Sequence, residues 1–246
     1  MTKQIEIELL EKIAKLEKTV AKLTEKSEKI EDIRYFKFSG ITETDLNTIL
    51  KIEQKFLESR FDIWFNSDIS ISENSRIFLI QLLQNEKMFL KTYNEEELTV
   101  KFISPILNKI NFRIPEKGVR DFYEHSLTYK TDTFILNGNP DFFVANGEER
   151  PEKPYFFIQE FKKAKDPKFP EPQLVAEMIA GLEISNFSEI RGAYIIGINW
   201  YFVILEKFAK DSYRYFVSEQ FNSTKQDELF QIYKNLLFVK REIKND

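Results

Sequence analysis

Two short motifs place charged residues inside strand-like parts of this sequence. Pro140-Asp141 opens one apolar run and Glu160-Phe161-Lys162 closes another, with 18 residues between Asp141 and Glu160. Runs rich in aromatic and branched residues predict strands with a buried face. Charged side chains are costly on such strands unless they are paired or bind something. A divalent cation between Asp141 and Glu160 would account for the two carboxylates, and a phosphate beside it would account for Lys162.

The spacing of Glu160 and Lys162 lets both residues act at one point. Residues i and i+2 of a strand share a side, so these two side chains are expected to project from the same face. A hard cation such as Mg²⁺ or Mn²⁺ prefers carboxylate, carbonyl and water ligands. A bound cation lowers the pKa of water and neutralises a phosphate, while a lysine orients the water or stabilises developing negative charge. The residue types therefore suit chemistry at a phosphate beside a bound cation.

The pattern resembles the PD-(D/E)XK, or restriction-endonuclease-like, nuclease superfamily. Three further segments carry the resemblance: Glu97–Leu107 looks like the acid-bearing helix before the motif strands, Pro172–Ile179 like the helix that begins near a glutamine, and Gly192–Ile198 like the strand after it. The resemblance covers roughly Glu96 to Leu205. It implies an α/β fold with a restriction-endonuclease-like core in the order α-β-β-β-α-β, in which a mixed central sheet of about four or five strands is flanked by helices.

The resemblance also implies roles for individual residues. Asp141, Glu160 and the Phe161 carbonyl would be the ligands of Mg²⁺ (or Mn²⁺), and Glu97 would bind the ion directly or through water. Asp141, Glu160, Lys162 and Gln173 would be the catalytic residues, with Gln173 holding the lysine or the water in place. The function implied is that of a metal-dependent nuclease acting on nucleic acid, with DNA favoured over RNA.

Two alternatives remain open at the level of the sequence. In the first, Asp141 caps a turn after Asn137–Pro140, and Glu160 and Lys162 are neighbours on a solvated strand face. In the second, the chain keeps a nuclease fold without the chemistry and acts as a coiled-coil interaction module.

A lysine-rich loop follows the second motif. Phe161–Lys168 holds four lysines against one acidic residue, and Lys163, Lys165 and Lys168 are candidates for nucleic-acid contacts. An ordinary solvated loop is the alternative. The net charge of −4 argues mildly against a nucleic-acid binder, since such proteins usually carry a basic surface, but clustered acidic residues in a metal site offset local lysines.

The N-terminal segment predicts an oligomer. Apolar residues recur with heptad spacing, with leucine or isoleucine at one position (Leu9, Leu16, Leu23, Ile30) and β-branched residues at the other (Ile13, Val20). This arrangement favours a parallel dimer, and an isolated helix of this length is marginal in water. We therefore predict a coiled-coil helix over residues 1–33 and a homodimer or higher oligomer; a helix that packs back on its own domain is the alternative.

The remaining segments complete the predicted domain organisation. A helical connector is expected over residues 34–95, with helices over Thr42–Arg60 and Asn74–Tyr93. The nuclease-like domain is expected over residues 96–246 and ends in a hairpin over Tyr201–Phe221 and a helix over Lys225–Ile243.

Composition excludes several other classes of protein. The chain has no cysteine and a single histidine, His125, so disulfides, thiolate metal sites and multi-histidine metal sites are excluded and a Ser–His–Asp triad is improbable. No phosphate-binding loop of the GxxxxGK[ST] or GxGxxG type occurs. No apolar window approaches the ~18 residues of a membrane span, and the charged N-terminus does not look like a signal peptide. We expect a cytoplasmic protein without membrane contact.

Overall fold

The structure is a computed structural model that describes residues 12–22, 33–163 and 169–245. The chain divides into two compact units, residues 1–35 with 130–135 and residues 36–129 with 136–246. The motif residues Asp141, Glu160 and Lys162 all belong to the second, larger unit.

Residues 12–22 of the smaller unit are helical. The apolar residues Ile13, Leu16 and Val20 on this helix are 47%, 63% and 58% exposed. These are described members of the predicted heptad seam, whereas Leu9, Leu23 and Ile30 lie outside the described residues. The coiled coil and the oligomer remain predictions.

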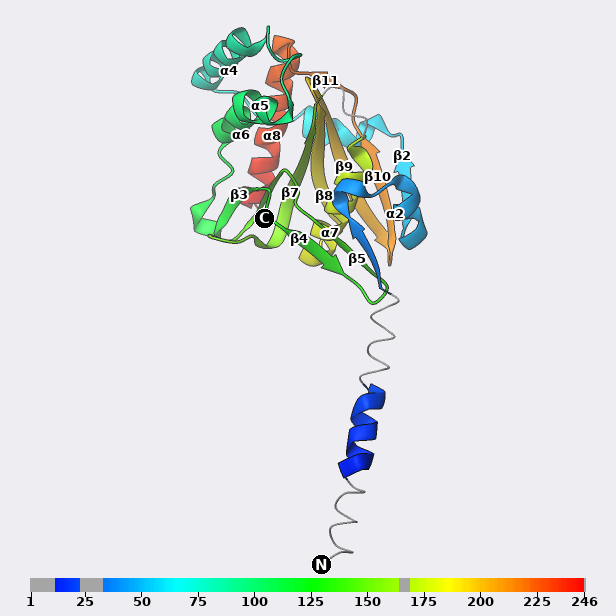
Figure 1. Cartoon of the computed structure of the whole chain (residues 1–246). Helices are drawn as coiled ribbons and strands as arrows, with labels where there is room; N and C mark the ends of the chain where they lie inside the picture. The colour runs from blue at the N-terminus through cyan, green and yellow to red at the C-terminus, as the bar shows by residue number, and fades with distance from the viewer. Residues whose placement is uncertain (1–11, 23–32, 164–168, 246) are drawn as a thin grey trace, which may run out of the picture. The chain divides into compact units, whose positions relative to one another are not determined.

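A large mixed sheet forms the centre of the second unit (Figure 1). Its eight strands follow the order β2-β10-β9-β8-β7-β6-β3, with β11 paired to β9. Their bounds are β2 (Lys51–Lys55), β3 (Val119–Tyr123), β6 (Phe142–Asn146), β7 (Glu152–Lys162), β8 (Glu189–Ile196), β9 (Asn199–Ala209), β10 (Ser212–Val217) and β11 (Phe221–Asn222). The β7–β8 and β2–β10 pairs are parallel and the other pairs are antiparallel. The predicted mixed α/β architecture is confirmed, with a larger sheet than expected.

A separate sheet has three strands in the order β1-β5-β4. These strands are β1 (Arg34–Lys37), β4 (Leu127–Lys130) and β5 (Phe134–Gly138).

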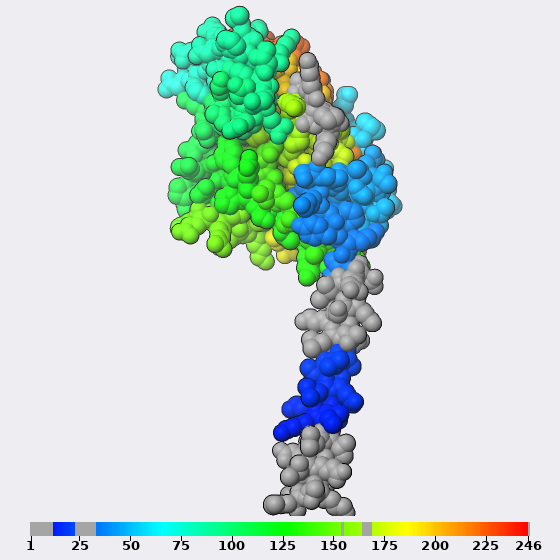
Figure 2. Space-filling view, in the orientation of Figure 1, coloured from blue at the N-terminus to red at the C-terminus, as the bar shows by residue number. Residues whose placement is uncertain are grey.

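Helices cover both faces of the large sheet (Figure 1). On one face, α7 (Glu171–Ser185) packs closely against β7 and β8. On the other, α6 (Ser104–Ile110) and α8 (Gln226–Asn245) share a core with the sheet residues Phe157 and Phe161. In Figure 2, the helices α4 (Glu73–Glu86), α5 (Glu95–Leu98) and α6 form one continuous cyan-to-green surface. None of the described helices combines the length and the apolar character needed to cross a membrane.

The segment before α5 differs from the predicted helical connector. A capping box between Thr42 and Asp45 starts α2 (Glu43–Ile49) as expected, but the helix ends at Ile49 and β2 follows, so the single helix predicted over Thr42–Arg60 is wrong. The reason is tertiary: β2 pairs in parallel with β10 at the edge of the large sheet, and such pairing overrides weak helix propensity. The short elements of this segment are η1 (Phe38–Gly40), η2 (Glu58–Phe61) and α3 (Asp62–Phe65).

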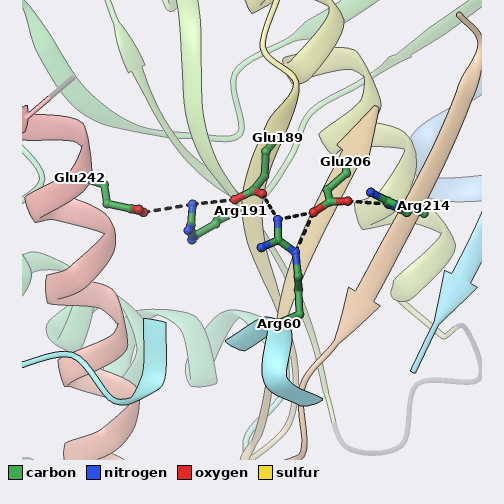
Figure 3. Close-up of polar contacts among 6 residues, drawn as sticks. All are labelled: Arg60, Glu189, Arg191, Glu206, Arg214 and Glu242. Atoms are coloured by element: carbon green, nitrogen blue, oxygen red, sulfur yellow. Dashed lines mark hydrogen bonds and ion pairs between the residues drawn. The ribbon is translucent and has the colours of Figure 1, made fainter. Parts of the chain in front are cut away.

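Ion pairs tie η2 to the start of β8 and the end of β9 (Figure 3). The guanidinium of Arg60 contacts the carboxylates of both Glu189 and Glu206. Arg191 extends the network, with its Nη1 atom 3.1 Å from oxygens of Glu189 and Glu242, and Arg214 donates to Glu206 at 2.5 Å. This network lies at the end of the strands opposite to Glu160 and Lys162, because β7 and β8 run parallel and Lys162 pairs with Ile196.

The predicted C-terminal elements are confirmed. Antiparallel β9 and β10 form the hairpin, with Asp211 in the left-handed conformation at its turn (φ 53°), and α8 closes the chain.

Upstream of the motif strands, α5 and α6 are joined by a π-helical turn, η3 (Thr99–Ile103). A proline follows this turn at position 105, where it lacks the amide that would continue an α-helical ladder. The 3-10 turn η4 (Pro115–Lys117) then leads to β3.

Candidate active site

Strand pairing brings the two predicted motifs together. β6 and β7 are antiparallel, with Phe142 opposite Gln159, so Asp141, one residue earlier, comes beside Glu160. The carboxylate of Asp141 accepts a hydrogen bond from the Phe161 amide at 2.6 Å. This contact differs from the turn-capping role considered as an alternative for Asp141.

Glu160 and Lys162 contact each other on one face of β7, as the strand period predicts. The Lys162 ammonium donates to Glu160 Oε1 and, at 3.0 Å, to the Phe161 carbonyl oxygen. Glu160 is 0% exposed. The alternative of a solvated strand face is therefore wrong for Glu160.

The first half of α7 brings Gln173 and a further acidic residue, Glu177, to this face of the sheet. Both residues are buried, and they lie four positions apart, on one side of the helix. Gln173 Nε2 donates to Glu177 Oε1 at 3.0 Å. The Gln173 amide thus contacts Glu177, and its predicted role of holding the lysine or the water stays a prediction.

Sequence reasoning did not anticipate Glu177, although a signal was present. Glu177 is the one charged residue in the apolar run Leu174–Leu182, and the whole of that run is buried in the helix. A carboxylate in the middle of a buried helix is costly unless it is paired or binds an ion.

The acid nearest to Lys162 from the upstream helix is Glu95, not Glu97. Glu95 Oε1 lies 3.8 Å from Lys162 Nζ. Glu97 instead accepts from the Asn94 amide at 3.1 Å in a capping box and lies 3.9 Å from Lys101. Two residues differ by about 200° around an α-helix, so the two side chains point in different directions. Glu95, rather than Glu97, therefore approaches the motif residues, and the metal-binding role expected for Glu97 stays a prediction.

The loop lysines are only partly described. Lys163 is exposed, which suits a contact with a polyanion, but the role stays a prediction. Lys165 and Lys168 lie outside the described residues.

Burial and like charges disfavour the ionised carboxylates. Burial raises the pKa of Asp141 to about 6. Burial and then the charge of Asp141 raise the pKa of Glu160 to about 8. For Glu177, burial and then the charge of Glu160 hold the pKa well above its ordinary value. Burial works in the opposite direction on Lys162, but Glu160 and the other acids outweigh it and raise the pKa of Lys162, so the ammonium stays charged.

The donor set suits a hard divalent cation. Carboxylates outnumber the single ammonium, and Glu160 Oε2 and Glu177 Oε2 are buried without a hydrogen-bond partner among the described residues. Within 12–22, 33–163 and 169–245, however, no three Asp, Glu or His side chains are arranged as a ready ligand set for a metal. The fit therefore rests on Asp141 and Glu160 with the Phe161 carbonyl, and Mg²⁺ commonly takes only one or two carboxylates and keeps several waters.

Comparison with known proteins adds little to this picture. No protein-family model and no curated protein matches the chain. One solved structure that is similar to it is described as "cryoEM structure DrdV-DNA complex", with 11% sequence identity and a TM-score of 0.36. The similarity covers 68% of this chain but only 14% of that chain. Similarity at this level supports no conclusion about fold family or function.

Proposed function

We propose that this protein is a metal-dependent nuclease that hydrolyses phosphodiester bonds, with DNA as the substrate and Mg²⁺ or Mn²⁺ as the cofactor. One observation supports the proposal above all others: two carboxylates and a lysine meet at the ends of adjacent strands. Asp141 accepts from the Phe161 amide and Glu160 accepts from Lys162. The proposal also rests on the resemblance of these motifs to the PD-(D/E)XK superfamily.

The carboxylates of Asp141 and Glu160 and the carbonyl oxygen of Phe161 would hold the cation. When bound, the cation would supply the Lewis acidity that activates a water and offsets charge on the scissile phosphate. Glu95 is placed to act through a water or through Lys162, from whose ammonium it lies 3.8 Å away.

Lys162 would act as a fixed positive charge. Its raised pKa keeps the ammonium protonated, so a role as general base at neutral pH is disfavoured. A preorganised cation in a partly buried site stabilises negative charge that develops on the phosphoryl oxygens. In this proposal, Glu160 orients the ammonium until the cation and the substrate bind.

Cleavage by active-site variants tests the proposal. Supercoiled plasmid, linear duplex, single-stranded DNA and RNA are each incubated with the full-length protein and Mg²⁺ or Mn²⁺. We expect DNA cleavage by the wild type, and a loss of about 100-fold or more in rate for Asp141→Asn and for Lys162→Ala, since each removes a group that acts in the transition state. Lys162→Ala should still bind Mn²⁺.

Lys153→Ala is the matched control, because Lys153 is an exposed lysine on the same strand as Lys162, near its opposite end. It should cleave like the wild type. Cleavage by Asp141→Asn at the wild-type rate would mean that any nuclease activity belongs to a different site. A wild type that cleaves none of the four substrates and binds neither cation would favour the alternative of an inactive nuclease-fold interaction module.

A further inference from the structure

Glu177 is a buried carboxylate that the proposed mechanism does not use. It is 0% exposed, and one of its oxygens, Oε1, accepts from Gln173 at 3.0 Å. The other oxygen, Oε2, has no hydrogen-bond partner among the described residues. An unpaired buried carboxylate oxygen costs free energy, so Glu177 needs an explanation beyond packing.

The neighbours of Glu177 place it at the proposed active site. It lies on α7, which packs against β7, the strand that carries Glu160 and Lys162. Glu160 is also 0% exposed, and its Oε2 atom likewise lacks a partner within the described part of the chain. Two unpartnered carboxylate oxygens thus come from the two elements, β7 and α7, that pack against each other.

We infer that Glu177 is a further ligand for a divalent cation, which it holds together with Glu160, and that Gln173 positions it. The inference rests on the proposed function, because it extends the same cation site. One divalent cation balances the three carboxylates of Asp141, Glu160 and Glu177 against the single ammonium of Lys162. Two carboxylates with waters are a sufficient protein ligand set for Mg²⁺ or Mn²⁺.

Gln173 directs the Glu177 carboxylate. Its amide occupies Oε1 and leaves Oε2 as the free oxygen. Ligating carboxylates are commonly held in this way by a second hydrogen-bonding group, and its removal weakens metal binding by about 10- to 100-fold. Gln173 is therefore a positioning residue in this proposal, not a catalytic one.

Calorimetric titration of Mn²⁺ into metal-free, full-length protein tests the inference without relying on activity. We expect Gln173→Ala to weaken Mn²⁺ binding about 10- to 100-fold, and Glu177→Gln to weaken it at least as much or to remove one bound ion. Glu177→Asp retains the charge and should bind Mn²⁺ more tightly than Glu177→Gln. If the glutamine variant does not fold, the aspartate variant still tests the inference.

Glu183→Gln is the matched control. Glu183 lies on the same helix and is largely buried, but it pairs with Lys207 and Tyr213, so its loss should leave Mn²⁺ binding unchanged. Wild-type stoichiometry and affinity in Glu177→Gln would overturn the inference. If Asp141→Asn loses Mn²⁺ while Glu177→Gln does not, the proposed function stands and only this inference fails. If the wild type binds no Mn²⁺, both fail.

Discussion

At the scale of single residues, the chemistry depends on how Asp141 and Glu160 hold their protons. Burial is the largest cause that raises the pKa of Asp141 to about 6 and that of Glu160 to about 8. Cation binding requires both groups to be deprotonated, so protons and the cation compete for the site.

Mn²⁺ affinity should therefore rise as the pH increases from 6 to 8.5 and be weak below pH 6. The sign follows from the raised pKa values, since protonated carboxyls must release protons before they bind the ion. Calorimetry in two buffers of different ionisation enthalpy measures both the affinity and the protons released. Asp141→Asn should bind Mn²⁺ more weakly at every pH. An affinity that does not change over this range would contradict the prediction.

The raised pKa of Asp141 also predicts that Asp141→Asn stabilises the metal-free protein at high pH. A folded pKa of about 6, above the ordinary 3.8, means that the folded state binds the proton more tightly than the unfolded state. The raised pKa therefore lowers the free energy of unfolding as the pH rises. This loss of stability is absent below pH 3.8, grows between pH 3.8 and 6 and is complete above pH 6. At pH 8 we expect the variant to raise the free energy of unfolding by about 1–3 kcal/mol.

Urea denaturation at pH 8 and pH 4 measures this effect. Asparagine retains an oxygen that can accept from the Phe161 amide, so the comparison isolates the charge. The exposed residue Asp132 supplies a control, since Asp132→Asn should change stability little at either pH. A variant that is less stable than the wild type at pH 8 would show that the Asp141 charge is favourable in the fold.

At the scale of elements, the site depends on how closely α7 approaches the sheet. Two glycines permit this approach. A Cβ atom added to Gly181 of α7 would lie 2.9 Å from the Ile158 side chain, and one added to Gly192 of β8 would lie 2.7 Å from the Met178 sulfur and 2.9 Å from the Ile158 backbone oxygen. The side chains can move, but the backbone oxygen is held in the β7–β8 pair.

Gly192→Ala should therefore push α7 away from the sheet and destabilise the protein by about 1–3 kcal/mol. Because α7 carries Gln173 and Glu177, Mn²⁺ affinity should fall as well. Thermal denaturation and Mn²⁺ titration measure the two effects. Gly40→Ala is the control, since no atom lies within 4 Å of its added Cβ. Unchanged stability and Mn²⁺ affinity in Gly192→Ala would mean that the helix and sheet adjust without cost.

At the scale of the whole molecule, the N-terminal helix decides the predicted assembly. Ile13, Leu16 and Val20 leave apolar side chains exposed on the described part of this helix. In a coiled coil these side chains would face a partner helix.

Removing residues 5–30, or substituting Leu16→Glu, should convert a dimer or larger oligomer into a folded monomer. A charge at a core position of the seam opposes pairing. Sedimentation velocity over a range of concentrations measures the assembly. Lys18→Glu is the matched control, because position 18 lies on the side of the helix away from the seam. An intact chain that stays monomeric at high concentration would refute the coiled coil.

The sequence by itself determined the features that depend on short-range periodicity. The period of a strand puts Glu160 and Lys162 on one face, and the apolar runs on either side of them predict neighbouring strands. The helices α7 and α8 and the β9–β10 hairpin were predictable for the same reason, because their apolar spacing and turn residues lie close together in the chain.

Only the tertiary structure decided which distant side chains complete the site. Glu95 and Glu97 are two residues apart on one short helical segment, and the packing of that segment determines that Glu95 approaches Lys162. The partner of Gln173 is Glu177; the sequence marks Glu177 as a lone charge in an apolar run, but only the packing of α7 against β7 brings it to the site. Residues 51–55 form the strand β2 because they pair in parallel with β10. These outcomes depend on contacts between segments far apart in the chain, which local pattern does not encode.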